Sequence, residues 1–159
     1  MKPKVYLESS VIGYLTGRPS RDVIVFARQQ LTQSWWTNHK TQYELFVSPL
    51  VLIEIARGDA NAAIERTKAI SDIPILDPKE EIAALATLLL KKGSLPAKAS
   101  DDALHIAWAA FYEIDYLLTW NCTHIANATT RKIIESTIRE AGYLVPTICT
   151  PEELFGELK

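Results

Sequence analysis

The sequence predicts an α/β protein of three layers, in which helices cover both faces of a central, mainly parallel sheet. Short apolar segments of strand length alternate with helical segments, the order typical of a parallel sheet flanked by helices. The segment Tyr116–Thr119 has no polar residue until its end, as expected for a strand covered on both faces. The segment Ser100–Phe111 is apolar on nearly every side after its first residues, except at His105, which indicates a helix buried at the centre of a domain.

Length, charge and cysteine content limit the kinds of protein to consider. The chain has 159 residues, which fits one domain over residues 1–159 that buries about 68–70% of its unfolded surface. The formal net charge of −2 argues against holding nucleic acid by bulk charge, so such a role would need a local basic patch or metal ions. Cys122 and Cys149 lie far apart, and the sequence has no signal segment or long apolar run. We therefore expect free thiols, no membrane association and a cytoplasmic location.

The first strand is expected over Lys4–Glu8, which places Glu8 at its carboxyl end, where ligands collect in open α/β sheets. An apolar turn over Val11–Leu15 follows. Ser20 is a plausible N-cap for a helix that extends to Trp36. Apolar residues at helical spacing predict the core face of this helix: Ile24, Ala27, Leu31 and Trp35.

The second strand is expected over Tyr43–Val47. Ser48 and the proline after it form the N-cap and first position of a helix that Gly58 closes. A polar helix over Asp59–Ser71 comes next. The segment Ile73–Leu76 predicts a third strand, and its proline favours the edge of the sheet.

Asp77 and the proline after it repeat the capping signal, here for a helix that continues over Ile82–Lys92 and ends at Gly93. The segment Leu95–Ala99 is then the loop that leads to the buried helix. After that helix, the strand Tyr116–Thr119 is followed by a helix near Thr130–Ala141 and a last strand at Thr147–Cys149. A closing helical turn at residues 150–153 ends the pattern.

Two aspartates stand at the start of the buried helix, and two interpretations remain open. In the structural one, Ser100 is the N-cap, and Asp101 and Asp102 complement the helix dipole at about 0.3–1 kcal/mol each. In the functional one, an aspartate points into a cleft as a metal ligand or general base. Glu54 favours function more strongly, because its surroundings at residues 50–56 are otherwise apolar. A carboxylate there costs several kcal/mol unless it is paired, protonated or bound to a cation.

Four oxygen-bearing side chains are predicted to converge at one edge of the sheet. Glu8 and Asn121 follow two strands, and Glu54 and Asp102 come from neighbouring helices. Carboxylates this close repel one another unless a hard cation lies among them. Mg²⁺ or Mn²⁺ suits such ligation.

At this point the chain resembles a known family. Residues 5–12, 51–55, 102–107 and 117–121 resemble, in order, the successive motifs of PIN-domain proteins, in particular the VapC-like toxins of bacterial type II toxin–antitoxin pairs. The resemblance covers essentially the whole chain. It implies a PIN-like fold and a metal-dependent endoribonuclease, a hydrolase that cuts single-stranded or structured RNA.

The resemblance also implies roles for individual residues. Glu8, Glu54 and Asp102 would be catalytic metal ligands for Mg²⁺ or Mn²⁺, and Asn121 falls where many members have a further aspartate. Ser10 and Thr119 match hydroxyl positions that support the site, and Asp101 is an adjacent acid. VapC-like proteins usually form homodimers and are silenced by a small antitoxin protein.

Two departures from the family pattern bear on activity. Glu8 stands where aspartate is common, and Asn121 is neutral, so we expect weaker metal binding and weakened activity. An alternative is therefore a PIN module that binds RNA or a protein partner without cleavage. A Mg²⁺-dependent phosphatase or a phospho-accepting receiver is a further alternative, but both need an aspartate nucleophile at the position of Glu8.

Three further features allow a functional and a structural interpretation. His105, one helical turn after Asp102, either contacts phosphate or is a packed core histidine, and the second is favoured. Cys122 and His124 are too sparse for a zinc site. Three lysines near the loop before the buried helix form either a basic patch or a solvated surface: Lys91, Lys92 and Lys98.

Overall fold

The computed structural model describes residues 1–92 and 95–156, and its centre is a four-stranded sheet in which every pairing is parallel. The strands are β1 (Lys4–Leu7), β2 (Glu44–Phe46), β3 (Tyr116–Leu118) and β4 (Thr147–Cys149), in the order β2-β1-β3-β4. This confirms the predicted α/β architecture with a parallel sheet.

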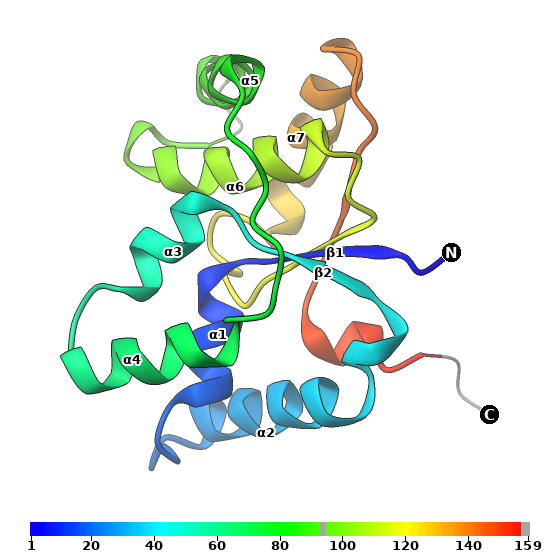
Figure 1. Cartoon of the computed structure of the whole chain (residues 1–159). Coiled ribbons are helices and arrows are strands. Elements are labelled where there is room, and N and C mark those ends of the chain that lie inside the picture. The colour runs from blue at the N-terminus through cyan, green and yellow to red at the C-terminus, as the bar shows by residue number, and fades with distance from the viewer. Residues whose placement is uncertain (93–94, 157–159) are drawn as a thin grey trace.

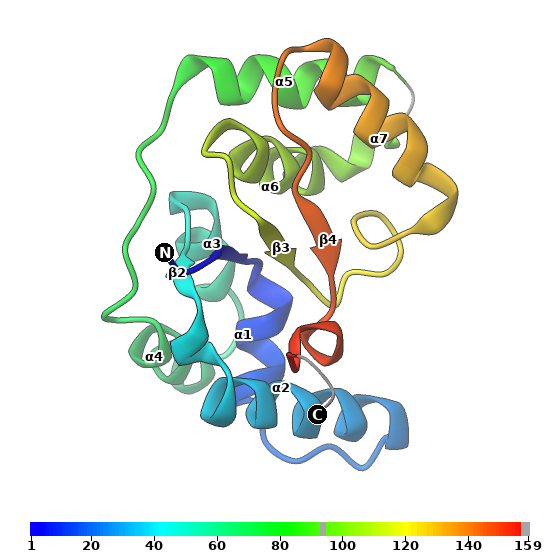
Figure 2. The same ribbon diagram turned by 90° about the vertical axis from the view of Figure 1, so that its right-hand side faces the viewer.

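Helices cover the sheet from both sides (Figure 1, Figure 2). Helices α1 (Ser9–Thr16), α2 (Val23–Asn38) and α4 (Ala60–Ala69) lie on one side, and α3 (Pro49–Ile55) packs against α1 and α4. Helices α5 (Glu80–Lys91), α6 (Ser100–Phe111) and α7 (Ala128–Glu140) lie on the other. Short 3-10 turns occupy Lys40–Gln42, Ala97–Ala99 and Pro151–Leu154. This arrangement confirms the predicted three layers.

The register of the two central strands determines where the site forms. Leu7 of β1 pairs with Leu118 of β3, and the backbone amide of Glu8 donates to the carbonyl of Leu118 at 3.1 Å. Both strands therefore end at the same level. Glu8 and Thr119, the residues that follow them, emerge side by side at the carboxyl edge of the sheet.

The buried core confirms that α6 is the central helix. Residues 105–110 are all buried, and Ala103 is fully enclosed. Burial of this much apolar surface is the main stabilising contribution to such a layered fold. The central strands β1 and β3 contribute further enclosed residues: Val5, Tyr6, Leu7, Leu117 and Leu118.

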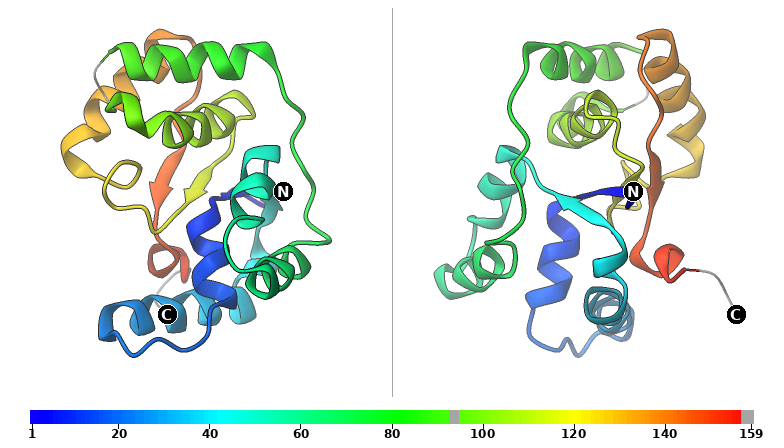
Figure 3. Two further views of the ribbon diagram at one scale, coloured as in Figure 1. Left: turned by 90° about the vertical axis from the view of Figure 1, so that its left-hand side faces the viewer. Right: turned by 45° about the vertical axis from the view of Figure 1, so that its right-hand side comes forward.

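Two segments differ from the elements predicted for them. The expected turn Val11–Leu15 is part of helix α1, because the side chain of Glu8 caps that helix by accepting from the amide of Ser10. The expected strand Ile73–Leu76 forms only a single bridge, between Ile75 and Val47. The segment that contains it is a long connection past β2 from one helical layer to the other (Figure 3), which leaves little of it parallel to β2.

Helix starts were predicted less well than helix positions. Helix α2 begins at Val23 with Asp22 as N-cap, not at Ser20, and it buries Gln29, Thr32 and Trp35. Ile24 and Ala27 were wrongly predicted as core, because this register turns them to solvent.

The capping predictions for Ser100 and Asp77 were also wrong. Ser100 is not a cap, because the 3-10 turn before it leads directly into α6 and Ser100 already has helical φ and ψ. Asp77 does not cap α5, which begins later, at Glu80. Gly93, the predicted end of that helix, lies outside the described residues.

The predicted caps at Ser48 and Thr150 and the predicted free thiols were confirmed. Ser48 caps α3 by accepting from the amide of Val51, and a capping box forms at Thr150 and Glu153. Both cysteines are free thiols, and burial raises the pKa of Cys149 to about 12. In the part of the chain that the structure describes, no helix has the length and apolar character needed to cross a bilayer.

Candidate metal centre

Glu8 is the most enclosed acid of the site, with 5% of its surface exposed. One carboxylate oxygen, Oε1, accepts from the hydroxyls of Ser10 at 2.5 Å and Thr119 at 2.6 Å. The other, Oε2, accepts from the hydroxyl of Ser9 at 2.8 Å and the amide of Ser10 at 2.9 Å. These four donors fix the carboxylate in one orientation at the end of β1.

The hydroxyls that hold Glu8 also tie its strand to β3. Ser10 Oγ accepts from the amide of Trp120 at 2.9 Å, and Thr119 Oγ1 accepts from the amide of Asn121 at 2.9 Å. Each hydroxyl thus donates to Glu8 and accepts from the loop after β3. Ser10 and Thr119 therefore link the two strand ends around one carboxylate.

Glu54 is joined to a chain of buried polar groups that extends into the core. Glu54 Oε1 lies 2.6 Å from His105 Nε2, and His105 Nδ1 lies 2.6 Å from the Tyr6 hydroxyl. The Tyr6 hydroxyl lies 2.7 Å from Ser48 Oγ. Tyr6 and Ser48 are fully enclosed, and His105 is 1% exposed.

The direction of these hydrogen bonds follows from the acceptor at the end of the chain. A carboxylate only accepts, so the imidazole donates from Nε2 to Glu54. In the neutral imidazole Nδ1 then accepts from Tyr6, which in turn accepts from Ser48. Every group of the chain is satisfied in this arrangement, which fixes both the tautomer of His105 and the position of the Glu54 carboxylate.

The surroundings of this chain shift two pKa values in opposite directions. Burial alone would raise the pKa of Glu54, but the hydrogen bond from His105, helped by Ser9 and Arg57, outweighs the effect of burial and lowers that pKa. Burial raises the pKa of Tyr6 well above its usual value, and the negative charges of Glu8 and Glu54 add to this effect. Glu54 is thus held charged and Tyr6 remains a neutral donor.

Asp102 has a separate and more open environment. Its Oδ1 accepts from Asn121 Nδ2 at 3.0 Å, and its Oδ2 lies 2.8 Å from His124 Nδ1. Asn121 also accepts from the amide of His124 at 3.1 Å. The side chains of His124 and Asp102 are 27% and 20% exposed. The loop after β3 therefore orients Asp102 from the solvent side.

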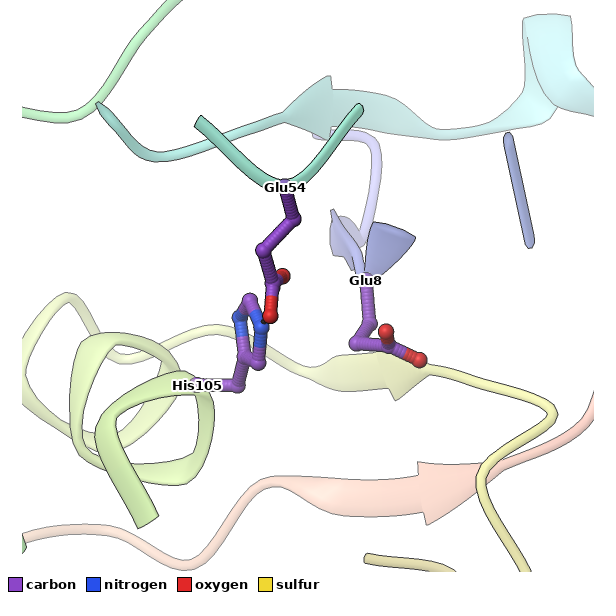
Figure 4. A group of neighbouring side chains, drawn as sticks. All are labelled: Glu8, Glu54 and His105. Atoms are coloured by element: carbon purple, nitrogen blue, oxygen red, sulfur yellow. Dashed lines mark hydrogen bonds and ion pairs between the residues drawn. The ribbon is translucent and has the colours of Figure 1, made fainter. Parts of the chain in front are cut away.

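Three of these side chains meet closely enough to share an ion. Glu8, Glu54 and His105 each offer a ligand atom within 4.8 Å of the other two (Figure 4). The two carboxylates contact hydroxyls, an amide and an imidazole, and within the described chain neither forms an ion pair with a lysine or arginine. Two neighbouring negative charges with this mainly oxygen donor set fit a hard divalent cation.

The comparison with known families agrees with this geometry. Residues 5–121, well over half of the chain, match the PIN domain family. The protein belongs to the PIN domain family. The matched part contains all the acids described above, from Glu8 to Asp102, and ends at Asn121. A search among curated proteins finds no relative of this PIN domain.

The predicted site residues of the PIN domain fall into three groups. Glu8 and Glu54 lie together, with His105 beside them. Asp102 and Asn121 contact each other, and Asn121 reaches Glu8 through Thr119. Asp101 instead faces Arg57 at 3.9 Å. The roles of all these residues as ligands stay predictions.

The sequence interpretation missed the partners that orient these acids. His105 is a packed histidine as favoured, but its contact with Glu54 was not foreseen, nor were Tyr6, Ser9 and His124 as neighbours of the site. The sequence did contain a signal for the contact between Glu54 and His105. Glu54 is the lone polar residue of segment 50–56 and His105 that of segment 103–111, and buried polar groups need partners.

Proposed function

We propose that this PIN domain is a metal-dependent endoribonuclease that hydrolyses phosphodiester bonds of single-stranded or structured RNA. PIN domains are in general metal-dependent nucleases, and PIN nucleases act on RNA. The observation that carries the proposal is the pair Glu8 and Glu54, with ligand atoms within 4.8 Å at the carboxyl edge of the sheet. Such paired carboxylates suit the binding of a divalent ion.

In this proposal Mg²⁺ or Mn²⁺ binds to oxygens of Glu8, Glu54, Asp102 and Asn121. When bound, the ion supplies an activated water as nucleophile and neutralises charge on the scissile phosphate. No side chain is needed as a covalent nucleophile. Because Asn121 is neutral, the donor set has three acids rather than four, which supports weaker binding, above all at a second ion.

The residues around these acids determine how the site works. Ser10 and Thr119 hold Glu8, His105 holds Glu54, and Asn121 with His124 holds Asp102. Glu8 already accepts four hydrogen bonds, so one donor must leave before it takes an ion or a proton from water. Ser9 is the best candidate, because its hydroxyl also influences Glu54.

The test is cleavage of mixed single-stranded RNA with Mn²⁺ by the purified protein and by Asp102→Ala and Glu54→Gln. Removing a ligand should reduce the rate by more than the about 10–100-fold typical of residues that only orient a ligand. Glu135→Gln, which removes an acid from the surface of α7, is the matched control and should cleave normally. Equal cleavage by all four proteins would indicate a contaminant and contradict the proposal.

A second candidate function is a PIN module that binds RNA or a protein without cutting. Asn121 favours it, because its amide donates to Asp102 where a fourth acid would otherwise add charge. The same assay separates the two functions. Binding without cleavage by the wild-type protein, in Mg²⁺ and in Mn²⁺, would select the second.

We further propose that the chain is the cytoplasmic toxin of a toxin–antitoxin pair, a single domain over residues 1–159 that forms a homodimer and is silenced by a small antitoxin. The VapC-like motifs support this assignment. Induced expression in a bacterial host should arrest growth, and Asp102→Ala should relieve the arrest at equal protein level. Normal growth with the wild-type protein would contradict the toxin role and leave the nuclease proposal in place.

A further inference from the structure

An acidic site cannot by itself attract an RNA strand. The chain has a formal net charge of −2, and the carboxylates of Glu8 and Glu54 meet at the proposed reaction centre. The phosphates of RNA are repelled by such a surface unless cations lie nearby, because backbone charge dominates protein–nucleic acid affinity. The position of the arginines around the site therefore decides where a strand can lie.

A groove of about 320 Å³ opens directly beside the two glutamates. Ser9, Ser10 and Gly13 of α1 line one wall, and the other is formed by Glu54 with two arginines, Arg57 and Arg66. A Cβ added at Gly13 would meet no atom within 4 Å, so the α1 wall leaves open space. The groove is continuous with the candidate metal centre, because Glu54, Ser9 and Ser10 take part in both.

Arg66 is held rigidly in this groove. Its Nε donates to the carbonyl of Ile55 at 2.8 Å, and its Nη2 donates to the carbonyl of Arg57 at 2.6 Å. These bonds satisfy carbonyls at the end of α3 and fix the guanidinium plane, and among the described residues Nη1 has no hydrogen-bond partner. A guanidinium that is already ordered loses little side-chain entropy when it binds an anion.

Arg57 is at the rim and is only loosely held. Its side chain is 63% exposed, and its ion pair with Asp101 is long at 3.9 Å. Exposed pairs of this kind contribute little. Arg57 nevertheless lines the same groove as Glu54. Arg57 is therefore near the reaction centre and free to exchange Asp101 for another anion.

We propose that Arg57 and Arg66 form a phosphate subsite, which holds an RNA phosphate adjacent to the one that is cleaved beside Glu54. The inference rests on the proposed function and names the part of the protein that grips its substrate. Guanidinium groups match phosphate oxygens with paired, charge-assisted hydrogen bonds. The neighbouring groove past Arg66 is lined by Arg18 but also by Asp59 and Glu65, so the favourable charge ends at Arg66.

The test measures binding of a short fluorescein-labelled oligouridylate by anisotropy over a range of KCl concentrations. CaCl₂ replaces Mn²⁺, and a gel verifies that the oligonucleotide stays intact. For single strands the logarithm of affinity falls with the logarithm of salt by about 0.7 for each phosphate contact. Arg57→Ala should reduce that slope by about 0.7 and weaken binding by about 3- to 10-fold at moderate salt.

Arg139→Ala is the matched control. Arg139 lies in the last turn of α7, its side chain is 65% exposed, and its ion pair with Glu135 is 3.8 Å long, so it resembles Arg57 in all but position. It should leave the slope unchanged. Gly13→Glu is a second variant that removes no contact and places a negative charge in the open space of the groove. It should weaken binding at least as much as Arg57→Ala.

Arg66→Lys tests the fixed arginine, with the thermal midpoint recorded because the carbonyl contacts of Arg66 are lost. It should weaken binding even where the fold remains intact. If the wild-type protein binds and cuts RNA while Arg57→Ala retains its salt slope and Gly13→Glu retains its affinity, the subsite is refuted and the nuclease stands. If the wild-type protein neither binds nor cuts RNA, the proposed function fails, and the subsite fails with it.

Discussion

Two histidine–carboxylate pairs each include one residue of helix α6, and the two pairs differ in burial and in their surroundings. His105 pairs with Glu54 at 2.6 Å, and His124 pairs with Asp102 at 2.8 Å. Asp102 and His105 are three residues apart on α6 and so share one face of it. The first pair has side chains 1% and 16% exposed, whereas the second has 27% and 20%.

The difference lies in what stands behind each imidazole. His105 is backed by Tyr6 of β1 and Ser48, the cap of α3, so the buried pair ties the sheet to two helices. His124 comes from the loop after β3, a few residues beyond Asn121, and its side chain is partly exposed. The buried pair therefore contributes to the fold as well as to the position of an acid, while the partly exposed pair of His124 and Asp102 only positions an acid.

The largest expected effect follows from removing each histidine. His105→Ala leaves Tyr6 and Glu54 without their buried partner and should lower the free energy of unfolding by about 3 kcal/mol. His124→Ala should lower it by less than about 1 kcal/mol. Denaturant unfolding of the two variants and the wild-type protein measures the difference.

Activity should not follow stability in these two variants. Each histidine orients a proposed metal ligand, so each loss should reduce RNA cleavage by about 10–100-fold at a temperature where both proteins are folded. Equal destabilisation by the two substitutions would refute the contrast between a buried structural pair and an exposed one.

Tyr6→Phe tests whether the buried pair depends on the groups behind it. The substitution removes one oxygen, so the acceptor Nδ1 of His105 loses its donor and the hydroxyl hydrogen of Ser48 loses its acceptor in an enclosed place. The free energy of unfolding should fall by about 1–3 kcal/mol. Chemical denaturation measures it, with Tyr14→Phe as a control at a partly exposed phenol. An unchanged free energy of unfolding would show that the row of stabilising hydrogen bonds ends at His105.

Asn121→Asp tests the surroundings of the second pair, because Asn121 contacts Asp102. Without metal the new carboxylate faces Asp102 in place of a donating amide, and stability should fall by about 1 kcal/mol. With Mn²⁺ the additional acid should strengthen ion binding, so the rise in thermal midpoint on adding Mn²⁺ should exceed that of the wild-type protein. A smaller rise would contradict the assignment of Asn121 to the ion's ligands.

Much of the fold could be predicted because each central element carries a simple pattern. The parallel strands are short apolar runs, and α6 is apolar almost all round, so their order along the chain already indicates three layers. The segment Ile73–Leu76 has a similar composition but forms only a bridge. Strand formation there depends on the path of a connection between layers, which local sequence does not encode. That the domain extends over the whole chain stays a prediction, since the family match ends at residue 121.

The candidate site was predicted residue by residue but not as a network. Glu54 and His105 were each recognisable as polar residues in apolar helices, yet their pairing depends on how α3 and α6 pack across β1. The open position of Asp102 likewise depends on the loop that brings His124 to it. Patterns along the chain identify groups that need a partner, while tertiary packing decides which partner each one meets.

The smallest expected effect is a dependence of stability on pH that belongs to the buried pair. The pKa of Glu54 is lowered in the folded protein, so its charged form contributes stability that is fully present above the unfolded glutamate pKa of about 4.3. This contribution is lost as the pH falls through the lower pKa of the folded state. Glu54→Gln removes the charge and keeps the shape, so the stability difference between wild type and variant should shrink below about pH 4.

The change in this stability difference should be small, because water partly screens Glu54. Glu135→Gln on α7 provides the surface control. A difference that grows on acidification would mean that the Glu54–His105 contact does not stabilise the carboxylate.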